Sequence, residues 1–379
     1  MKVTLLKPKA KNQGGLEKAT MRIASYFVQR GAEVTLLTTG SSKAPSLPAP
    51  INTIRLPVYS WPPFIRLEQF DRKTALWQKS NPSDVVLGLD RTRTQTHIRA
   101  GNGVHAAFLE TRLRSANVFK RISLTINPLH RKILQIEKQA YESPELKKIF
   151  TNSRMVRDEI FSYYAVDPTK IEVIHNGVEW YEMEVDFSCW AAKKSSICQS
   201  LGLHPDRFQF LFVGNGYERK GLMPLLHALA PLRDRPFDLS IVGKERAMHF
   251  YRRQAANLGL GDNVHFFGQQ NQIRPFYQAA DAIVIPSFYD PFANVTVEAL
   301  AMGLYVLTSK HNGGAEILTV PTNGQVLPDI NDPISFALYL DETMKRRNTE
   351  QSALLARQSV QHLDFSHQLN ILVDSCYAP

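Results

Sequence analysis

Short apolar runs alternate with amphipathic segments along the first part of the chain. Residues 3–6 and 33–38 are rich in Val, Leu and Thr, which favours strands, whereas residues 16–29 place apolar side chains at helical spacing. Gly31 follows this segment, as glycines often do where a helix ends. The resulting strand–helix–strand unit predicts a parallel sheet with helices on both of its faces.

The alternation continues as far as a short turn, His175-Asn176-Gly177. We predict an edge strand at residues 51–58, after a Pro- and Ser-rich loop at 41–50. Further strands are expected at 84–87, 148–151 and 171–174, and helical segments at 112–139, interrupted by Pro128, and at 153–164. The turn marks the predicted domain boundary.

A second series of strands and helices begins at residue 208. We predict strands at 208–213, 237–242, 264–267 and 282–285, and helices at 179–203, 219–230, 245–258 and 273–280. The expected fold class is α/β, with two Rossmann-like doubly wound domains facing each other across a cleft. They span residues 1–175 and 176–361, and a helix within 362–379 is expected to pack back on the first domain.

Composition changes this picture little. The chain has 379 residues, 44% hydrophobic and 21% charged, which is typical of globular proteins of two domains. A net charge of +10 favours an anionic partner. Three cysteines without metal or redox spacing fit a reducing cytosol, and no apolar run is long enough to span a membrane. No pattern in the sequence indicates an oligomeric state.

The richest candidate chemistry follows the apolar run at residues 281–286. Asn294 is expected to cap a helix that runs to residue 302 and ends at Gly303. A loop between a strand's carboxyl end and a helix's amino end is where open α/β sheets bind ligands, and free N–H groups favour an anion there. Asp290 and Glu298 lie in this turn. Carboxylates beside a phosphate site accept hydrogen bonds from sugar hydroxyls.

A second turn, at residues 214–221, combines glycines with two cations. It follows a strand and opens a helix, but it is neither a Walker A loop nor a dinucleotide fingerprint. The guanidinium of Arg219 can form two hydrogen bonds to a pyrophosphate, while the ammonium of Lys220 adds a single positive charge. This pair is expected to replace a metal ion, since no ligand cluster in the sequence suggests one. The alternative is that both are solvated helix residues.

The first domain offers weaker signals. Gly14 and Gly15 allow a ligand phosphate to approach the backbone, or form a plain turn. His105 lies in a glycine-rich loop and is either catalytic or a structural hydrogen-bonding residue. Three arginines of the preceding basic segment bind an anionic acceptor or belong to a solvated loop, namely Arg91, Arg93 and Arg99.

Residues 112–132 mix cations with bulky apolar side chains. Such a segment is able to lie on an anionic membrane surface, where each Lys or Arg contributes about 1 kcal/mol. Packing against the core with a basic outer face explains the pattern almost as well.

Taken together, the motifs resemble those of the retaining glycosyltransferases of family four, which have the GT-B fold, and most of all the bacterial lipopolysaccharide core glucosyltransferases. The likeness covers nearly the whole chain, through residues 14–17, 173–178, 214–221, 264–268, 280–287 and 290–298. It implies transfer of a hexose, glucose being the commonest, from a nucleotide diphosphate sugar such as UDP-glucose to a saccharide or glycolipid acceptor. It implies no cofactor and no metal ion, and a cytoplasmic enzyme peripheral to the inner face of the cell membrane.

The resemblance also assigns roles to individual residues. Arg219 and Lys220 would hold the donor pyrophosphate, Glu298 the ribose, and Gly15 would approach the diphosphate. His105 would lie beside the transferred sugar, and Gln270 in the loop that receives the base. The backbone amides of one loop would hold the donor sugar and phosphate, namely those of Phe292, Ala293, Asn294 and Val295.

Three positions depart from the family pattern, and one of them is Ala32, which stands where a His is common before the second strand. Asp290 replaces the usual first Glu of the acidic pair, and its shorter side chain puts its reach to the sugar in question. Tyr305 stands where the family usually has proline.

Two other functions remain open from the sequence. One is a nucleotide-sugar epimerase of the same fold, which would turn over donor without an acceptor. The other is a basic lipid- or nucleic-acid-binding protein without catalysis, although the sequence lacks the aromatic-flanked basic motifs expected for nucleic acid.

Overall fold

The computed structural model describes residues 1–8, 15–39, 50–59, 61–114, 117–346 and 348–377. The chain divides into two compact units. The first comprises Met1–His175 and Ser366–Pro379, and the second comprises Asn176–Phe365. Gly14 and almost all of the predicted loop at 41–50 lie outside the described residues.

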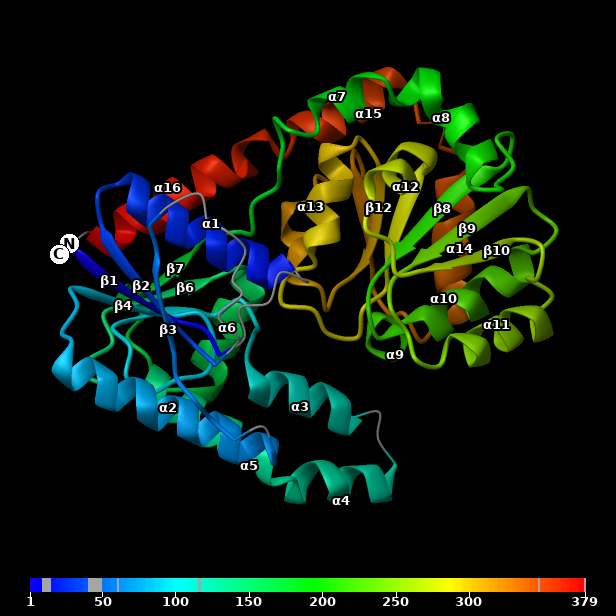
Figure 1. The fold of residues 1–379 in the computed structure, drawn as a ribbon. Helices are drawn as coiled ribbons and strands as arrows, with labels where there is room; N and C mark the ends of the chain where they lie inside the picture. Colours follow the sequence, from blue (N-terminus) through cyan, green and yellow to red (C-terminus); the bar gives the residue numbers. More distant parts are fainter. Residues whose placement is uncertain (9–14, 40–49, 60, 115–116, 347, 378–379) are drawn as a thin grey trace. The chain divides into compact units, whose positions relative to one another are not determined.

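The first unit contains a seven-stranded parallel sheet (Figure 1), which confirms the predicted α/β class. Its spatial order is β3-β2-β1-β4-β5-β6-β7, so the strand order reverses between β1 and β4. The strands are β1 (Lys2–Leu6), β2 (Glu33–Thr38), β3 (Asn52–Arg55), β4 (Val85–Gly88), β5 (His97–Arg99), β6 (Lys148–Thr151) and β7 (Ile171–Val173).

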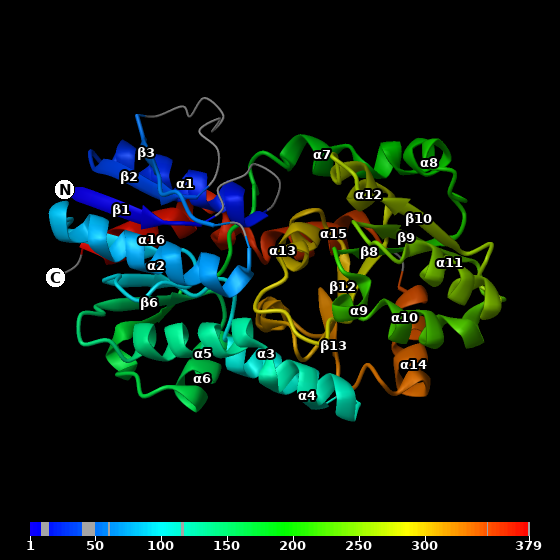
Figure 2. The same cartoon turned by 60° about the horizontal axis from the view of Figure 1, so that its bottom comes forward.

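Helices cover both faces of this sheet (Figure 2). On one face, α1 (Gly15–Gln29) and α16 (Phe365–Tyr377) bury Phe27 and Val373 against β1, β2 and β4. On the other face, α2 (Pro63–Ser80) packs Phe70 onto Leu6 and neighbouring strand residues. Alternate residues of the strands point to opposite faces, which is why one strand serves both cores.

The remaining helices of the first unit are α3 (His105–Arg114), α4 (Val118–Ile126), α5 (Pro128–Tyr141) and α6 (Arg154–Tyr163). The predicted break at Pro128 is confirmed, because this residue begins α5. Ser153 caps α6 as predicted, its hydroxyl accepting from the amide of Val156. None of the residues of α4 is buried.

The second unit contains a six-stranded parallel sheet of order β10-β9-β8-β11-β12-β13, which reverses between β8 and β11. Its strands are β8 (Phe208–Val213), β9 (Phe237–Val242), β10 (Val264–Gly268), β11 (Ala282–Ile285), β12 (Tyr305–Ser309) and β13 (Gly324–Leu327). The helices are α7 (Glu184–Ser188), α8 (Trp190–Ser200), α9 (Tyr217–Lys220), α10 (Leu222–Leu229), α11 (Met248–Asn257), α12 (Arg274–Ala279), α13 (Asn294–Ala301), α14 (Pro333–Met344) and α15 (Glu350–Gln358).

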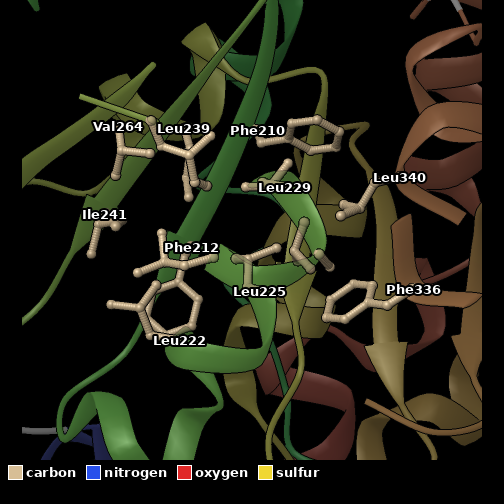
Figure 3. Packing of buried hydrophobic residues seen from close by; sticks show 14 of the residues in the cluster. Phe210, Phe212, Leu222, Leu225, Leu229, Leu239, Ile241, Val264, Phe336 and Leu340 are labelled. Carbon is tan, nitrogen blue, oxygen red and sulfur yellow. The ribbon is translucent and has the colours of Figure 1, made fainter. Parts of the chain in front are cut away.

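One core of this unit is shown in Figure 3, where strand residues such as Phe210 and Phe212 meet Leu225 of α10 and Phe336 of α14. The other face of the sheet is covered by α12, α13 and α15. Both faces are therefore apolar, which explains why its strands read as continuous hydrophobic runs.

Several elements differ from the sequence prediction. Helix α2 was not predicted, because few of its residues are buried and its apolar pattern is weak. The basic segment 90–100 contains β5, and β12 was also missed. The predicted helix at 219–230 is interrupted at Gly221, whose φ of 77° is incompatible with a continuing right-handed helix. His105 begins a helix rather than lying in a loop.

In the part of the chain that the structure describes, no helix has both the length and the apolar character needed to cross a membrane.

Candidate active site

The two loops singled out in the sequence lie at neighbouring strand ends. Strands β8 and β11 pair directly, at the point where the order of the second sheet reverses. The turn with Arg219 and Lys220 follows β8, and the loop with Asp290 follows β11. Open α/β sheets bind ligands at the carboxyl ends of strands at such a switch point.

Both cations of the first loop approach a single carboxylate. Lys220 Nζ lies 2.5 Å from Asp290 Oδ2, and Arg219 Nη1 lies 3.5 Å from the same oxygen. Arg219 also donates to the carbonyl of Tyr289 at 3.0 Å. The side chain of Arg219 is 44% exposed, against 11% for Lys220. Arg219 and Lys220 are therefore not simply solvated, and the guanidinium keeps an open side toward solvent.

Glycines make the close packing at this turn possible. A Cβ on Gly214 would lie 2.9 Å from Cγ of Lys220, so the glycine leaves room for the lysine stem. A Cβ on Gly221 would lie 1.8 Å from the carbonyl oxygen of Pro286, which links this turn to the end of β11. Glycine is thus required where the two loops meet.

The helix after the second loop does not begin as predicted. Asn294 is its first residue rather than its N-cap, and Ala293 stands at the cap position without a side-chain hydrogen bond. The side chain of Asn294 instead accepts from Nδ2 of Asn176 at 2.8 Å. The capping prediction was wrong because the side chain of Asn294 is hydrogen-bonded to Asn176, 118 positions away in the sequence.

Asn312, which was not predicted as a site residue, connects the start of α13 to the neighbouring loop through side-chain hydrogen bonds. Its Oδ1 accepts from the amides of Ala293 and Gly314, both at 3.0 Å. Its Nδ2 donates to the hydroxyls of Thr296 and Thr308. A fully bonded, buried amide of this kind fixes the loop in one conformation.

Glu298, one turn into α13, is oriented by a second unpredicted residue. The hydroxyl of Tyr277 donates to Glu298 Oε2 at 2.6 Å. Tyr277 is fully buried, and this burial together with the neighbouring carboxylate raises its pKa well above the ordinary value. The phenol therefore stays protonated and remains a donor. No local sequence signal connects these residues, which are 21 positions apart.

The other predicted donor residues surround this centre. Phe292 and Ala293 are buried, and Val295 is half-buried on the first turn of α13. Gln270 follows β10, two strands away from β8, and its amide donates to the carbonyl of Phe267 at 2.8 Å.

The first unit has its own switch point, between β1 and β4. Lys7 follows β1 and Asp90 follows β4, and their Nζ and Oδ2 atoms lie 3.4 Å apart. Gly15 is the first residue of α1, and Gly14 lies outside the described residues.

His105 lies after the next strand of this sheet, at the start of α3. Its Nε2 is 3.0 Å from Nδ1 of His130, and its backbone amide donates to the carboxylate of Glu137. Burial, with help from Arg91 and His130, lowers the pKa of His105 to about 3. The imidazole is consequently neutral at physiological pH.

The structure gives the three predicted acceptor arginines protein partners. Arg91 Nε lies 3.1 Å from Glu137, and Arg93 Nε lies 2.5 Å from Asp71. Arg99 donates to the carbonyl of Ile174, and burial lowers its pKa to about 10. The alternative of a solvated basic loop is therefore wrong, whereas the acceptor role stays a prediction.

No group of three or more His, Cys, Asp or Glu side chains that would hold a metal ion occurs among the described residues.

Two family models match the chain in succession. Residues 13–179 match Glycosyltransferase Family 4, and residues 193–357 match Glycosyl transferases group 1.

Individual proteins support the same relationship. The uncharacterised glycosyltransferase MJ1607 of Methanocaldococcus jannaschii is 31% identical over 52% of this chain, which spans only 50% of that protein. The lipopolysaccharide glucosyltransferase WaaG of Escherichia coli K12 is 24% identical over 90% of this chain and 88% of its own length.

Solved structures share the fold over the whole chain. The crystal structure of WaaG, a glycosyltransferase involved in lipopolysaccharide biosynthesis, gives a TM-score of 0.81 at 22% identity and covers 100% of both chains. Anabaena HepE in complex with UDP-glucose gives 0.73 at 16% identity, covering 100% of this chain and 99% of the other. At these identities the likeness establishes the GT-B fold.

Proposed function

Because the chain belongs to the GT-B glycosyltransferases, with a family 4 domain followed by a group 1 domain, we propose that it transfers glucose from a nucleotide diphosphate sugar to a saccharide or glycolipid acceptor. The proposed acceptor is the lipopolysaccharide core, and the anomeric configuration of the sugar is retained. Similarity to WaaG along 90% of this chain supports this choice of acceptor.

The observation that carries the proposal is the convergence of Arg219, Lys220 and the start of α13 at one switch point. The cations and the backbone amides would bind the donor diphosphate without a metal ion. Tyr277 orients Glu298 by donating to one of its oxygens, and this carboxylate would accept from the ribose hydroxyls. Gln270 and its loop would receive the base.

Asp290 has two successive partners in this proposal. Without donor, it is the counter-ion of Lys220. When the donor binds, its diphosphate would pair with Lys220 and Arg219. The carboxylate of Asp290 would then turn and accept a hydrogen bond from a hydroxyl of the sugar. The position of Asp290 between the two cations supports this role despite its shorter side chain.

The transfer step exchanges one bond at the anomeric carbon for another. The bond from this carbon to the diphosphate oxygen breaks, and the leaving electron pair is stabilised by Arg219 and Lys220. The acceptor hydroxyl forms the new bond on the same face and gives its proton to a donor phosphate oxygen. Neutral His105 would hydrogen-bond the transferred sugar, and Gly14 and Gly15 would approach the diphosphate.

In the proposed complex, the predicted acceptor contacts are Arg91, Arg93 and Arg99. The carboxylates of Glu137 and Asp71 already orient the first two, which limits them to a fixed direction of approach. This arrangement favours recognition of an anionic group such as a phosphorylated core saccharide.

The variant Lys220→Ala tests whether the cations at this switch point bind the donor diphosphate. We expect turnover of UDP-glucose with a core acceptor to fall by about 100-fold or more, because charge on the leaving diphosphate is no longer neutralised. Lys193→Ala, which removes an exposed lysine of α8, is the matched control and should keep full activity. Full activity of folded Lys220→Ala would refute the mechanism.

Three further measurements address the details. The proton spectrum of the product reports whether the anomeric configuration is retained. Activity that survives a chelator supports a reaction without a metal ion. Labelled donor incubated without acceptor should stay unchanged, whereas its conversion to another sugar would favour an epimerase.

A peripheral contact with the cytoplasmic face of the membrane is also proposed, through α4. Its exposed apolar residues include Phe119 and Ile122, with Lys120 and Arg121 beside them. Residues 112–132 contain no acidic side chain, so anionic lipids meet only positive charge. Phe119→Ser should reduce cosedimentation with phosphatidylglycerol vesicles, while neutral phosphatidylcholine vesicles should bind neither protein. Equal binding of both proteins to anionic vesicles would contradict this contact.

A further inference from the structure

A cavity lies at the amino-terminal ends of strands in the second sheet. The proposed donor site lies at the carboxyl ends of the strands of this sheet. The cavity has a volume of about 210 Å³, and its lining includes Phe208 at the start of β8, Tyr305 at the start of β12 and Asn323 just before β13. In a parallel sheet the amino-terminal ends of all strands lie at the same end of the sheet. Strand β12 has five residues and is therefore roughly 16 Å long. This length separates the cavity from the loop that holds Asp290, which lies at the carboxyl ends of the strands.

A guanidinium group stands in the lining of this cavity. The Cζ atom of Arg346 lies 4.7 Å from the centre of the Tyr305 ring. Among the residues that the structure describes, no carboxylate lies within ion-pair distance of Arg346. The ring therefore holds one face of the cation, while its N–H groups are available to an acceptor.

Asp281 is the one acid among the described residues that line the cavity, and its charge is already compensated. One of its oxygens pairs with Lys194, and the other accepts from the backbone amide of Gln209 at 2.9 Å. It therefore does not cancel the positive charge of Arg346. The other polar residues that the structure describes in the lining are neutral and include Asn348 and Ser352.

The size and lining of the cavity define the class of ligand. A volume of about 210 Å³ lies below the roughly 300–1,000 Å³ of pockets for drug-sized ligands, so the cavity suits a small organic molecule rather than a nucleotide sugar. Its lining is apolar at Phe208 and Ala356, whereas the polar groups of Asn323, Thr343 and Ser352 already form hydrogen bonds within the protein, so the charge of Arg346 is the main feature that would attract a ligand. We propose that this cavity binds a small organic oxyanion, a phosphate or a carboxylate, with Arg346 as the anion-binding group.

Calorimetric titration of the full chain tests this site. The protein carries Lys220→Ala, so that phosphate binding at the proposed donor site is suppressed. The probes are inorganic phosphate, glycerol 3-phosphate, citrate and, as the uncharged match, glycerol. We expect saturable binding of at least one anion at millimolar concentration or below, and none of glycerol. The ranking of the three anions distinguishes free phosphate from an organic phosphate or a carboxylate.

Variants identify where the anion binds. Adding Arg346→Gln should weaken binding at least tenfold, whereas Arg253→Gln, at an exposed arginine of α11, should leave it unchanged. Tyr305→Phe keeps the ring beneath the cation and should bind within about twofold of the parent, while Tyr305→Ala should bind more weakly. Absence of saturable binding, or equal binding with and without Arg346, would overturn the proposal, whatever the fate of the proposed transferase activity.

Discussion

The two sheets each place a lysine and an aspartate at the point where the strand order reverses, but the two pairs differ in what surrounds them. Lys7 of the first unit is 4% exposed, and its ammonium also reaches the carbonyl of Leu89 at 3.4 Å. Lys220 of the second unit shares Asp290 with Arg219, whose side chain is 44% exposed. Arg91, the second cation at the first pair, is 21% exposed and also pairs with Glu137, whereas Arg219 at the second pair is more exposed.

This difference shows that topology selects where a ligand site can form, while the side chains decide whether one does. At the first switch point two cations, Lys7 and Arg91, meet two carboxylates, those of Asp90 and Glu137, so their charges are balanced. At the second, two cations share one carboxylate, so an excess positive charge remains for a diphosphate. The predictions below test this distinction.

The largest effect is expected from Gly221→Ala. The added Cβ would meet the carbonyl oxygen of Pro286 at 1.8 Å, and the backbone would keep a φ of 77°. We expect the free energy of unfolding to fall by more than about 3 kcal/mol in denaturant titrations. Gly216→Ala is the control, because its φ is similar but no atom lies within 4 Å of its Cβ, so that only about 1–2 kcal/mol should be lost. Equal losses would show that the backbone contact is unimportant.

Replacing each lysine by methionine compares the two pairs directly. Lys7→Met leaves Asp90, which is 27% exposed, without its buried partner, and should cost about 1–3 kcal/mol of stability. Lys220→Met should instead weaken binding of UDP at least tenfold, measured by calorimetry, because it removes one of two cations. The distinction fails if Lys7→Met impairs UDP binding as strongly as Lys220→Met does.

A smaller effect is expected from Tyr277→Phe. Loss of the hydroxyl removes one hydrogen bond that orients Glu298, so affinity for UDP should fall about fivefold, or about 1 kcal/mol. Tyr251→Phe removes the hydroxyl of a buried tyrosine in α11 and serves as the control. An unchanged affinity in Tyr277→Phe would show that Glu298 needs no support.

A further effect concerns pH. Because the pKa of His105 in the folded protein is about 3, below the ordinary 6.5, its neutral form favours folding above pH 6.5. That contribution is lost as the pH falls from 6.5 toward 3. The stability advantage of wild type over His105→Gln should therefore shrink between pH 7 and pH 5 in denaturant titrations. A growing advantage would mean that His105 is charged in the folded protein, beside His130 and Arg91.

Much of the second sheet was predictable from sequence. Strands β8, β9 and β11 match their predicted bounds, since both faces are buried and the apolar runs are continuous. The two loops of the site were found because glycines, cations and acids follow these runs directly. Their meeting at Asp290 follows from strand order, which the sequence pattern does not reveal.

The rest depends on partners distant in sequence. Arg91 meets Glu137, 46 positions away, and because the sequence does not reveal this partner, a solvated loop stayed open as an alternative. Tyr277 and Asn312 orient the site through side-chain hydrogen bonds that no spacing indicates. Helix α2 has few buried positions, and a weak apolar pattern does not specify a helix.

The return of α16 to the first sheet has a consequence for synthesis on the ribosome. The second unit is continuous from residue 176 to 365, whereas the first needs residues made after it. Leu369, Leu372 and Val373 fill the core under α1, so that core stays open until they emerge. The second unit is therefore the first able to complete its core, although it is translated later than most of its neighbour.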